Sequence, residues 1–222
     1  MPAGLLRILL LGGLVIFASG CASLFPVEAD EDLAHFATQA PQPGQTAPEL
    51  EARRLDGTPV RLSEILDGKR PVVLQLGSHS CPVYRYRRFD IAKLQREYAG
   101  DVAFVVVYTV EAHPEGSKSP YRDGEWLTNI NRITRTRVRQ PESTEARIAQ
   151  AIWSTEKLGR NDMVVVDTFE DQTWQRYGSA PSAAFVIDTA GNIVLRQPWV
   201  EPDGIRRALD GLLQRDGTTP GP

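Results

Sequence analysis

The sequence predicts an α/β fold in which a central mixed β-sheet is flanked by helices. Three short apolar runs, at 72–76, 102–108 and 163–166, are typical of strands buried within a sheet. Between the first two lies a segment, 82–98, whose larger apolar residues recur mostly at helical spacing. A buried strand, a helix and a second buried strand predict a right-handed, parallel βαβ unit.

Length and composition indicate one domain. The 222 residues carry a net charge of −3 and include two cysteines. This length suits one sizeable domain, expected over residues 47–215, and no basic block is long enough to suggest a nucleic-acid partner. Residues 216–222 are rich in Gly, Thr and Pro and are expected to form a disordered tail.

The first 20 residues resemble an export signal, because Arg7 precedes an apolar stretch from Ile8 to Phe17 that is too short to span a membrane. Ala-Ser-Gly-Cys then ends at Cys21 and resembles the lipidation motif of bacterial lipoproteins. We expect an exported, membrane-anchored lipoprotein facing the periplasm or the cell exterior, with lipid on Cys21; an ordinary secretory signal is the alternative. Residues 21–46 are expected to be a tether.

The remaining elements follow from local patterns. Residues 50–60 surround an Asp-Gly pair and predict a strand-turn-strand lead-in, and 62–66 predict one helical turn. A helix capped by Ser143 or Thr144 is expected to end at Gly159, with Ile148, Ile152 and Trp153 on one face. After the third strand we expect a short helix over 169–177, a hairpin of strands 184–187 and 193–195, and a final helix over 202–215.

A long polar insertion, 109–141, follows the second core strand. Structureless stretches of this length in compact domains tend to be functional or disordered. Its arginines at 132, 135, 137 and 139 predict a solvated basic face or a clamp for a carboxylate.

Cys81 is the candidate nucleophile. It follows the first apolar run and a Gly-Ser turn, and Pro82 suits the first turn of the next helix. Unpaired N–H groups at the helix start, together with Arg85 and Arg88, are expected to lower the pKa of the thiol. If Cys21 carries lipid, Cys81 has no partner in the chain and is expected to be reactive or to pair with another molecule. The alternative is a cysteine that only packs in the core.

The order of these elements describes a thioredoxin-like fold with an insertion after the second core strand. Such folds place a reactive residue after the first central strand and a proline before the hairpin that faces it. We therefore expect a cis peptide bond between Ala180 and Pro181, opposite Cys81.

Six short motifs resemble the iodothyronine deiodinases. They are G-S-H-S-C-P at 77–82, V-Y-T-V-E-A-H at 107–113, D-G-E-W at 123–126, V-V-V-D-T at 164–168, Y-G-S-A-P at 177–181 and Q-P-W at 197–199. The resemblance implies a reductive, thiol-dependent deiodination with an external thiol reductant and no bound cofactor. It implies that Cys81, at the position of the family's usual selenocysteine, attacks iodine, and that Glu111 and His113 take part in catalysis.

Residue chemistry supports the same roles. A histidine can pass a proton to a departing group or hold a thiolate as an ion pair. Glu111 lies two residues before His113 on an extended segment and is expected to point to the same side and orient it. Ser78, His79, Pro82, Trp126 and Pro181 are expected to line or support the pocket.

The chain also departs from the family's pattern. Cysteine in place of selenocysteine implies slower deiodination, and His79 stands where the family commonly has a second cysteine. Ser182 and Ala183 replace the family's Glu-Arg after the proline, and residues 114–122 are inserted between two of the motifs. The substrate pocket is the part that these departures affect most, because kinship of fold does not fix a substrate.

The sequence therefore predicts an exported thiol-dependent oxidoreductase of deiodinase-like type, acting on a small molecule such as a halogenated aromatic or a peroxide. One alternative is a one-cysteine thiol peroxidase, in which Cys81 becomes a sulfenic acid and Ser78 replaces the threonine of the peroxiredoxin motif. Another is a non-enzymatic, membrane-tethered binding module. A disulfide reductase would need a second cysteine beside Cys81, and a metal site of His79, Cys81 and His113 has no supporting spacing, so no metal is expected.

Overall fold

The computed structural model describes residues 33–66 and 68–214 of the chain. The predicted leader, Cys21 and the predicted tail lie outside these ranges. The strands are β1 (Ala52–Arg54), β2 (Pro59–Val60), β3 (Val72–Gly77), β4 (Ala103–Tyr108), β5 (Met163–Asp167), β6 (Ala184–Ile187) and β7 (Ile193–Gln197). The helices are α1 (Ala34–Gln39), α2 (Leu62–Ile65), α3 (Pro82–Glu97), α4 (Asn129–Ile133), α5 (Thr144–Leu158), α6 (Gln172–Arg176) and α7 (Pro202–Leu213).

The strands form one mixed sheet in the order β2-β1-β5-β4-β3-β6-β7. Strands β3, β4 and β5 are parallel to one another, whereas β6 runs antiparallel to β3 and to β7. The predicted βαβ unit is thus β3-α3-β4. In its register Gly77 lies opposite Tyr108, so the segments that leave β3 and β4 emerge side by side.

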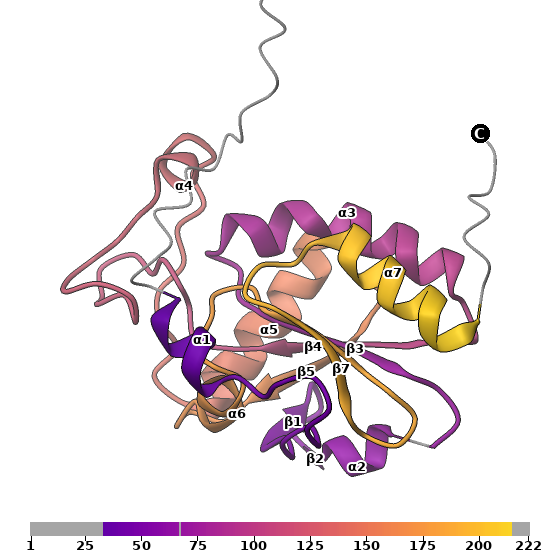
Figure 1. Ribbon diagram of the computed structural model, residues 1–222. Helices are drawn as coiled ribbons and strands as arrows, with labels where there is room; N and C mark the ends of the chain where they lie inside the picture. The colour runs from indigo at the N-terminus through magenta and orange to yellow at the C-terminus, as the bar shows by residue number, and fades with distance from the viewer. Residues whose placement is uncertain (1–32, 67, 215–222) are drawn as a thin grey trace, which may run out of the picture.

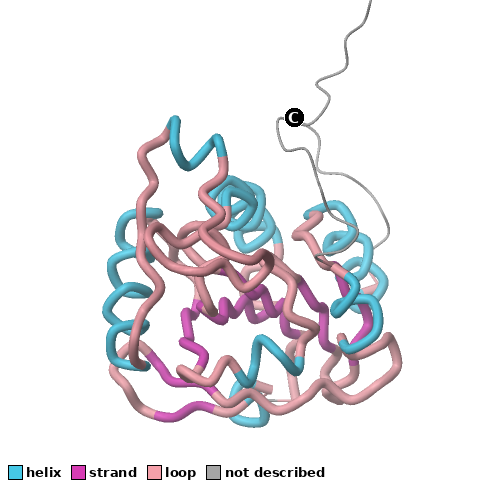
Figure 2. Tube along the Cα trace, turned by 90° about the vertical axis from the view of Figure 1, so that its left-hand side faces the viewer, coloured by secondary structure: helices cyan, strands magenta, loops and turns pink. Residues whose placement is uncertain are grey.

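Helices cover both faces of the sheet, and Figure 2 shows the strands as a twisted layer between them. Alternate residues of β3 explain this arrangement, since a strand directs successive side chains to opposite faces. Leu74 and Leu76 pack in one core with Phe36 of α1. Val73 packs in a second core with Ile91 of α3, and α7 contributes to the same core (Figure 1). The thioredoxin-like fold predicted from the sequence is confirmed.

Helix α5 buries the expected face only in part: Ile148 packs against the cluster around Cys81, but the buried residues of the helix are others. Its buried residues are Arg147, Ala151 and Ser154, whereas Trp153 is 43% exposed. The buried guanidinium of Arg147 forms an ion pair with Asp171, at 2.7 Å, and donates to the carbonyl of Thr168. The apolar pattern did not predict this face, because the polar residues Arg147 and Ser154 occupy buried positions of the helix.

The part of the predicted tether that the structure describes, residues 33–46, lies against the domain. Phe36 and Ala40 are buried in the core, and the backbone of Gln45 bonds to that of Ile193 in β7. An isolated bridge between Thr46 and Asn192 extends this contact. These residues belong to the folded domain, because Phe36 and Ala40 are buried in its core. The tether was predicted from the polar composition of the segment, which does not reveal these two apolar contacts.

The insertion has a defined structure and carries α4. Figure 1 shows α4 at the outer end of a looped segment that projects beyond the sheet. Thr128 caps this helix by accepting a hydrogen bond from the N–H of Asn131. None of the helices in the described ranges is long and apolar enough to cross a membrane.

Candidate functional site

Cys81 lies where β3 gives way to α3. A four-residue loop, Ser78–Cys81, follows the strand, and Cys81 is the N-cap residue of α3 with Pro82 in its first turn. Gly77 makes the passage possible, because a Cβ at this position would collide with the ring of Tyr84 in α3. The predicted position of the cysteine at the entrance of a helix is confirmed.

The Cys81 loop is bonded to the segment that follows β4. The N–H of Ala112 donates to Ser78 Oγ at 3.2 Å, and the N–H of His113 donates to Ser80 Oγ at 2.9 Å. In the opposite direction, the N–H of Ser80 donates to Glu111 Oε2 at 2.7 Å. Two serines and one carboxylate therefore fix the cysteine loop against the segment that carries His113.

Glu111 holds the loop in place and is fully buried. Besides the Ser80 N–H, its carboxylate accepts hydrogen bonds from Tyr108 Oη and from Gln150 Nε2, the latter at 2.6 Å. None of these three bonds involves the ring of His113, so the expected orienting contact between Glu111 and His113 is absent from the described hydrogen bonds. Glu111 is better described as a positioning residue of the Cys81 loop.

His113 is buried and packs edge-on against Trp126, with 4.3 Å between the ring centroids. Burial lowers the pKa of His113 to about 4, although a hydrogen bond to the backbone of Trp126 acts in the opposite direction. Its Nδ1 has no hydrogen-bond partner among the described residues. The imidazole is therefore neutral at physiological pH, and it cannot hold a thiolate as a charged ion pair in this conformation.

His79 faces α5. Its Nδ1 lies 2.8 Å from Ser154 Oγ, and its ring packs against Trp153 at 4.3 Å between centroids. Burial lowers the pKa of His79 to about 4, with positive charge on Arg85 as a lesser cause. Within residues 33–66 and 68–214, no group of three His, Cys, Asp or Glu side chains is arranged to hold a metal ion.

Arg85 and Asn131 complete the support of the loop. Arg85 is buried and donates to the carbonyl of His79 at 2.5 Å and to Asn131 Oδ1 at 2.6 Å. Asn131 in turn donates from Nδ2 to the carbonyl of Ser80 at 2.7 Å. Asn131 was not predicted as a site residue, because nothing in a polar insertion distinguishes one buried amide from the exposed ones. The local signal is Thr128, whose capping position three residues earlier indicates a helix that contains Asn131. Arg88, expected near the thiol, instead donates to the carbonyl of Leu158.

Cys81 itself is only 1% exposed, in an apolar cluster that includes Tyr84, Val106 and Ala112, with Tyr121 and Trp199 packed against it. Burial is the largest effect on the thiol and raises its pKa to about 11. The N–H groups of Tyr84 and Val83, and then Arg85, lower it by less, while the charge of Glu111 raises it further. The predicted low pKa is therefore wrong for this conformation, because desolvation outweighs the helix N-terminus.

The peptide bond before Pro181 is trans, since the described residues contain no cis peptide bond. The expected cis bond is thus wrong, and Ser179, at φ +58°, helps the chain turn before the proline instead. Pro181 is buried, and the next residue, Ser182, forms a bridge with Trp199. Ser182 Oγ and Trp199 Nε1 are buried polar atoms with no partner among the described residues.

Fold and site together define a thioredoxin-like protein whose single described cysteine lies at the start of the helix after the first central strand. Solved structures with the same fold include a thiol:disulfide interchange protein of the thioredoxin family from Chlorobium tepidum, 17% identical, with a TM-score of 0.50 over 78% of this chain and 97% of that one. An uncharacterised conserved protein from Geobacillus kaustophilus is 18% identical, with a TM-score of 0.55 over 81% of this chain and 86% of that one.

Sequence comparison identifies the family. The model of the family described as iodothyronine deiodinase matches residues 29–204, and the chain belongs to this family. Thyroxine 5-deiodinase of Rattus norvegicus is 29% identical over 162 residues, covering 72% of this chain and 49% of that protein. The enzyme of the same name from Sparus aurata is 29% identical over 168 residues, covering 73% and 56% respectively. The chain thus spans about half the length of these curated relatives.

Proposed function

We propose that the protein is a thiol-dependent oxidoreductase that reductively removes iodine from an aromatic substrate, with Cys81 as the nucleophile. The observation that carries the proposal is the bonding of the Cys81 loop to the Glu111–His113 segment in a chain of the deiodinase family. The substrate class follows the names of the relatives, which are thyroxine 5-deiodinases. An iodinated phenol is the simplest probe of that class.

The proposed reaction has three steps. The Cys81 thiolate attacks iodine, the C–I bond breaks, and the ring carbon keeps the electron pair and takes a proton, leaving a sulfur–iodine bond on Cys81. An external thiol attacks this sulfur, releases iodide and forms a mixed disulfide. A second external thiol then restores Cys81 and leaves as the disulfide of the reductant, so two thiols are oxidised for each C–I bond reduced.

The residues around Cys81 have separate roles in this proposal. Neutral His113 offers its unpartnered Nδ1 as a hydrogen-bond acceptor for a hydroxyl of the substrate. Glu111 positions the loop through the N–H of Ser80. External reduction is required because the described part of the chain has no second cysteine near Cys81.

Reaction requires the site to open. Cys81 is buried, and Tyr121 and Trp126 of the insertion lie over this end of the sheet, against the Cys81 cluster and His113 respectively. Moving the part of the insertion after His113 away would hydrate the sulfur and remove the desolvation that raises its pKa. The N–H groups of Val83 and Tyr84 and the charge of Arg85 would then favour the thiolate.

A non-enzymatic binding module is the second candidate, because a thiol with a pKa of about 11 is a weak nucleophile. One experiment separates these candidates. The purified full-length chain is incubated with dithiothreitol and either an iodinated phenol or hydrogen peroxide, and iodide release and peroxide consumption are measured. Cys81→Ser is the test variant and Cys21→Ser the matched control.

We expect iodide release by the wild type and by Cys21→Ser, and none by Cys81→Ser. Consumption of peroxide alone would replace the proposal with a thiol peroxidase, and turnover of neither compound would favour the binding module. Circular dichroism of Cys81→Ser checks that the loss of activity does not reflect loss of the fold.

We also propose that lipid on Cys21 anchors the protein at a membrane, after export through the signal in residues 1–20. The support is the sequence pattern alone. Mass spectrometry of the mature N-terminal peptide tests this: an acylated Cys21 at the N-terminus is expected, and an unmodified peptide beginning elsewhere would contradict it.

A further inference from the structure

Helix α4 and the segment after it carry exposed arginines and one exposed isoleucine, Ile133. Residues 126–141 contain four arginines and neither Asp nor Glu. At the apex, Ile133 is 77% exposed, the most of any large apolar side chain in the described chain. We call Arg132, Ile133, Arg135 and Arg139 the α4 surface.

Most of the positive charge of this segment is left uncompensated. Arg137 forms an ion pair with Glu115. Arg132 donates through Nε to the carbonyl of Leu127, a bond that leaves its charge in place. Within the described residues, Arg135 and Arg139 have no ion-pair partner. Three of the four arginines therefore present net charge to the solvent.

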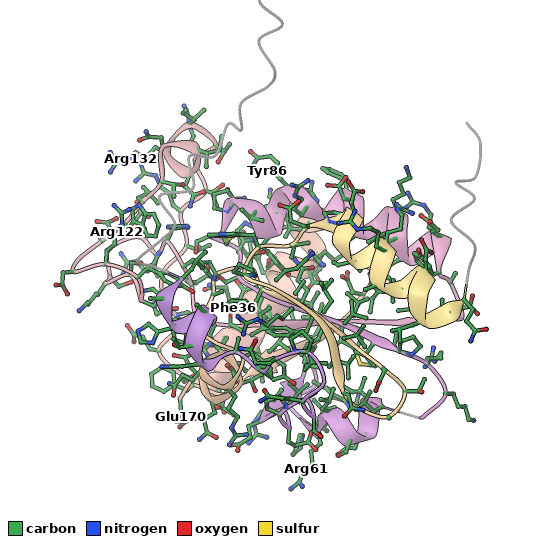
Figure 3. The ribbon with its side chains drawn as sticks, viewed as in Figure 1. Phe36, Arg61, Tyr86, Arg122, Arg132 and Glu170 are labelled. Carbon is green, nitrogen blue, oxygen red and sulfur yellow. The ribbon has the colours of Figure 1, made fainter. Side chains whose placement is uncertain are left out.

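The fold directs this surface outward. Asn131 anchors the inner side of α4 by its bonds to Ser80 and Arg85, whereas Arg132 and Ile133, which follow it, are exposed. Figure 1 places α4 at the end of the projecting segment, and Figure 3 shows Arg132 and Arg122 there, at the opposite end from Arg61. The apex is narrow, since α4 is only five residues long.

We propose that the α4 surface docks on a lipid bilayer that contains anionic headgroups. A protruding apex with one exposed isoleucine is too small for a stable protein interface, which buries far more area. A bilayer accepts the isoleucine at the headgroup boundary while the arginines pair with lipid phosphates. This inference is independent of the proposed chemistry at Cys81.

Hydrogen exchange of the full-length chain tests the proposal locally, since the apolar leader can bind lipid in every variant. Amide exchange in residues 128–140 is compared in buffer, with phosphatidylcholine vesicles, and with vesicles of phosphatidylcholine and phosphatidylglycerol in equal amounts. We expect protection with the mixed vesicles only, and its loss at high ionic strength.

The triple variant Arg132→Glu/Arg135→Glu/Arg139→Glu should lose this protection, because each arginine near an anionic surface is worth about a fivefold change in partition. Ile133→Ser should weaken the protection of residues 128–140 by the mixed vesicles, but by a smaller factor than the triple variant does. The charge-matched control, Arg61→Glu/Arg96→Glu/Arg207→Glu, changes exposed arginines elsewhere on the domain and should behave as wild type.

Two results would overturn the proposal. Equal protection of residues 128–140 by both kinds of vesicle, or by neither, would remove the role of anionic lipid. Protection by soluble polyglutamate to the same extent as by the mixed vesicles would identify the surface as a site for an acidic protein instead.

Discussion

Replacing Asn131 by alanine should expose Cys81. The side chain of Asn131 is fully buried and makes two hydrogen bonds, to the Ser80 carbonyl at 2.7 Å and from the Arg85 guanidinium at 2.6 Å. A neutral hydrogen bond contributes about 1 kcal/mol and one to a charged group about 1.5 to 3 kcal/mol. Allowing for water that replaces part of both bonds, Asn131→Ala should weaken the attachment of the insertion by about 2 kcal/mol.

That change corresponds to about a 30-fold larger population of the open form, since about 1.4 kcal/mol is a factor of ten. The assay is the rate of iodoacetamide labelling of Cys81, followed by intact mass in a Cys21→Ser background that leaves one thiol. Labelling from the open form alone should accelerate by the same factor of about 30. The rate should depend only weakly on low concentrations of urea, because local opening exposes little surface.

The control is Asn129→Ala, which removes an exposed amide from the same helix and should leave the labelling rate within about twofold of wild type. A rate for Asn131→Ala within that same range would refute the idea that the insertion controls access to Cys81. Equal acceleration in both variants would mean that general loosening of α4, and not the two buried bonds, exposes the thiol.

Three further predictions concern single residues of the site. Labelling of wild-type Cys81 should rise about tenfold per pH unit between about pH 7 and pH 10, because the closed state keeps its proton up to its pKa of about 11; a plateau below about pH 8 would contradict this. Glu111→Gln should lower the free energy of unfolding in urea by about 2 to 3 kcal/mol, since an amide cannot accept all three hydrogen bonds, whereas Glu115→Gln, which removes a surface ion pair, should cost at most about 1 kcal/mol. Iodide release should show no inflection near pH 6.5 from His113, whose pKa of about 4 leaves it neutral above about pH 5; an inflection there that His113→Gln abolishes would be evidence against a buried, neutral imidazole.

The sequence was sufficient for the framework because the framework depends on local patterns. Apolar runs predicted β3, β4 and β5, and Pro82 predicted the start of α3. The pairing of β1 with β5 was not predictable, since it joins residues more than a hundred positions apart and β1 is only three residues long. The antiparallel lead-in of β1 and β2 was predicted because its turn is local.

The sequence predicted that the segments carrying the candidate residues meet, but part of the predicted chemistry is wrong. The loop that precedes Cys81 is bonded through Ser80 to Glu111 and to His113, because β3 and β4 are adjacent and parallel. The direction of the Glu111 carboxylate is set by hydrogen bonds from Tyr108 and from Gln150. Gln150 belongs to α5, which lies beside Glu111 only in the folded chain, so the sequence near Glu111 does not predict this bond. Burial of the Cys81 sulfur also depends on residues distant in the sequence. The prediction of a low pKa considered only the N–H groups at the start of the helix and the nearby arginines.

Under the opening proposed above, the insertion, whose Tyr121 packs against the Cys81 cluster, has more influence on the reactivity of Cys81 than the helix that presents it. The N–H groups at the start of α3 act on the sulfur whether it is covered or not, yet in the closed form they are outweighed and the pKa of the thiol stays near 11. The pKa of the thiol falls below its ordinary value only if water reaches the sulfur and removes the effect of burial. Access of water depends on contacts that hold the insertion, such as the hydrogen bond from Asn131 to Ser80. Cys81 is therefore not an active thiolate by virtue of its position alone: its reactivity should follow the free energy of opening, and variants of this chain that differ only in the insertion should differ in reactivity with the Cys81 loop unchanged.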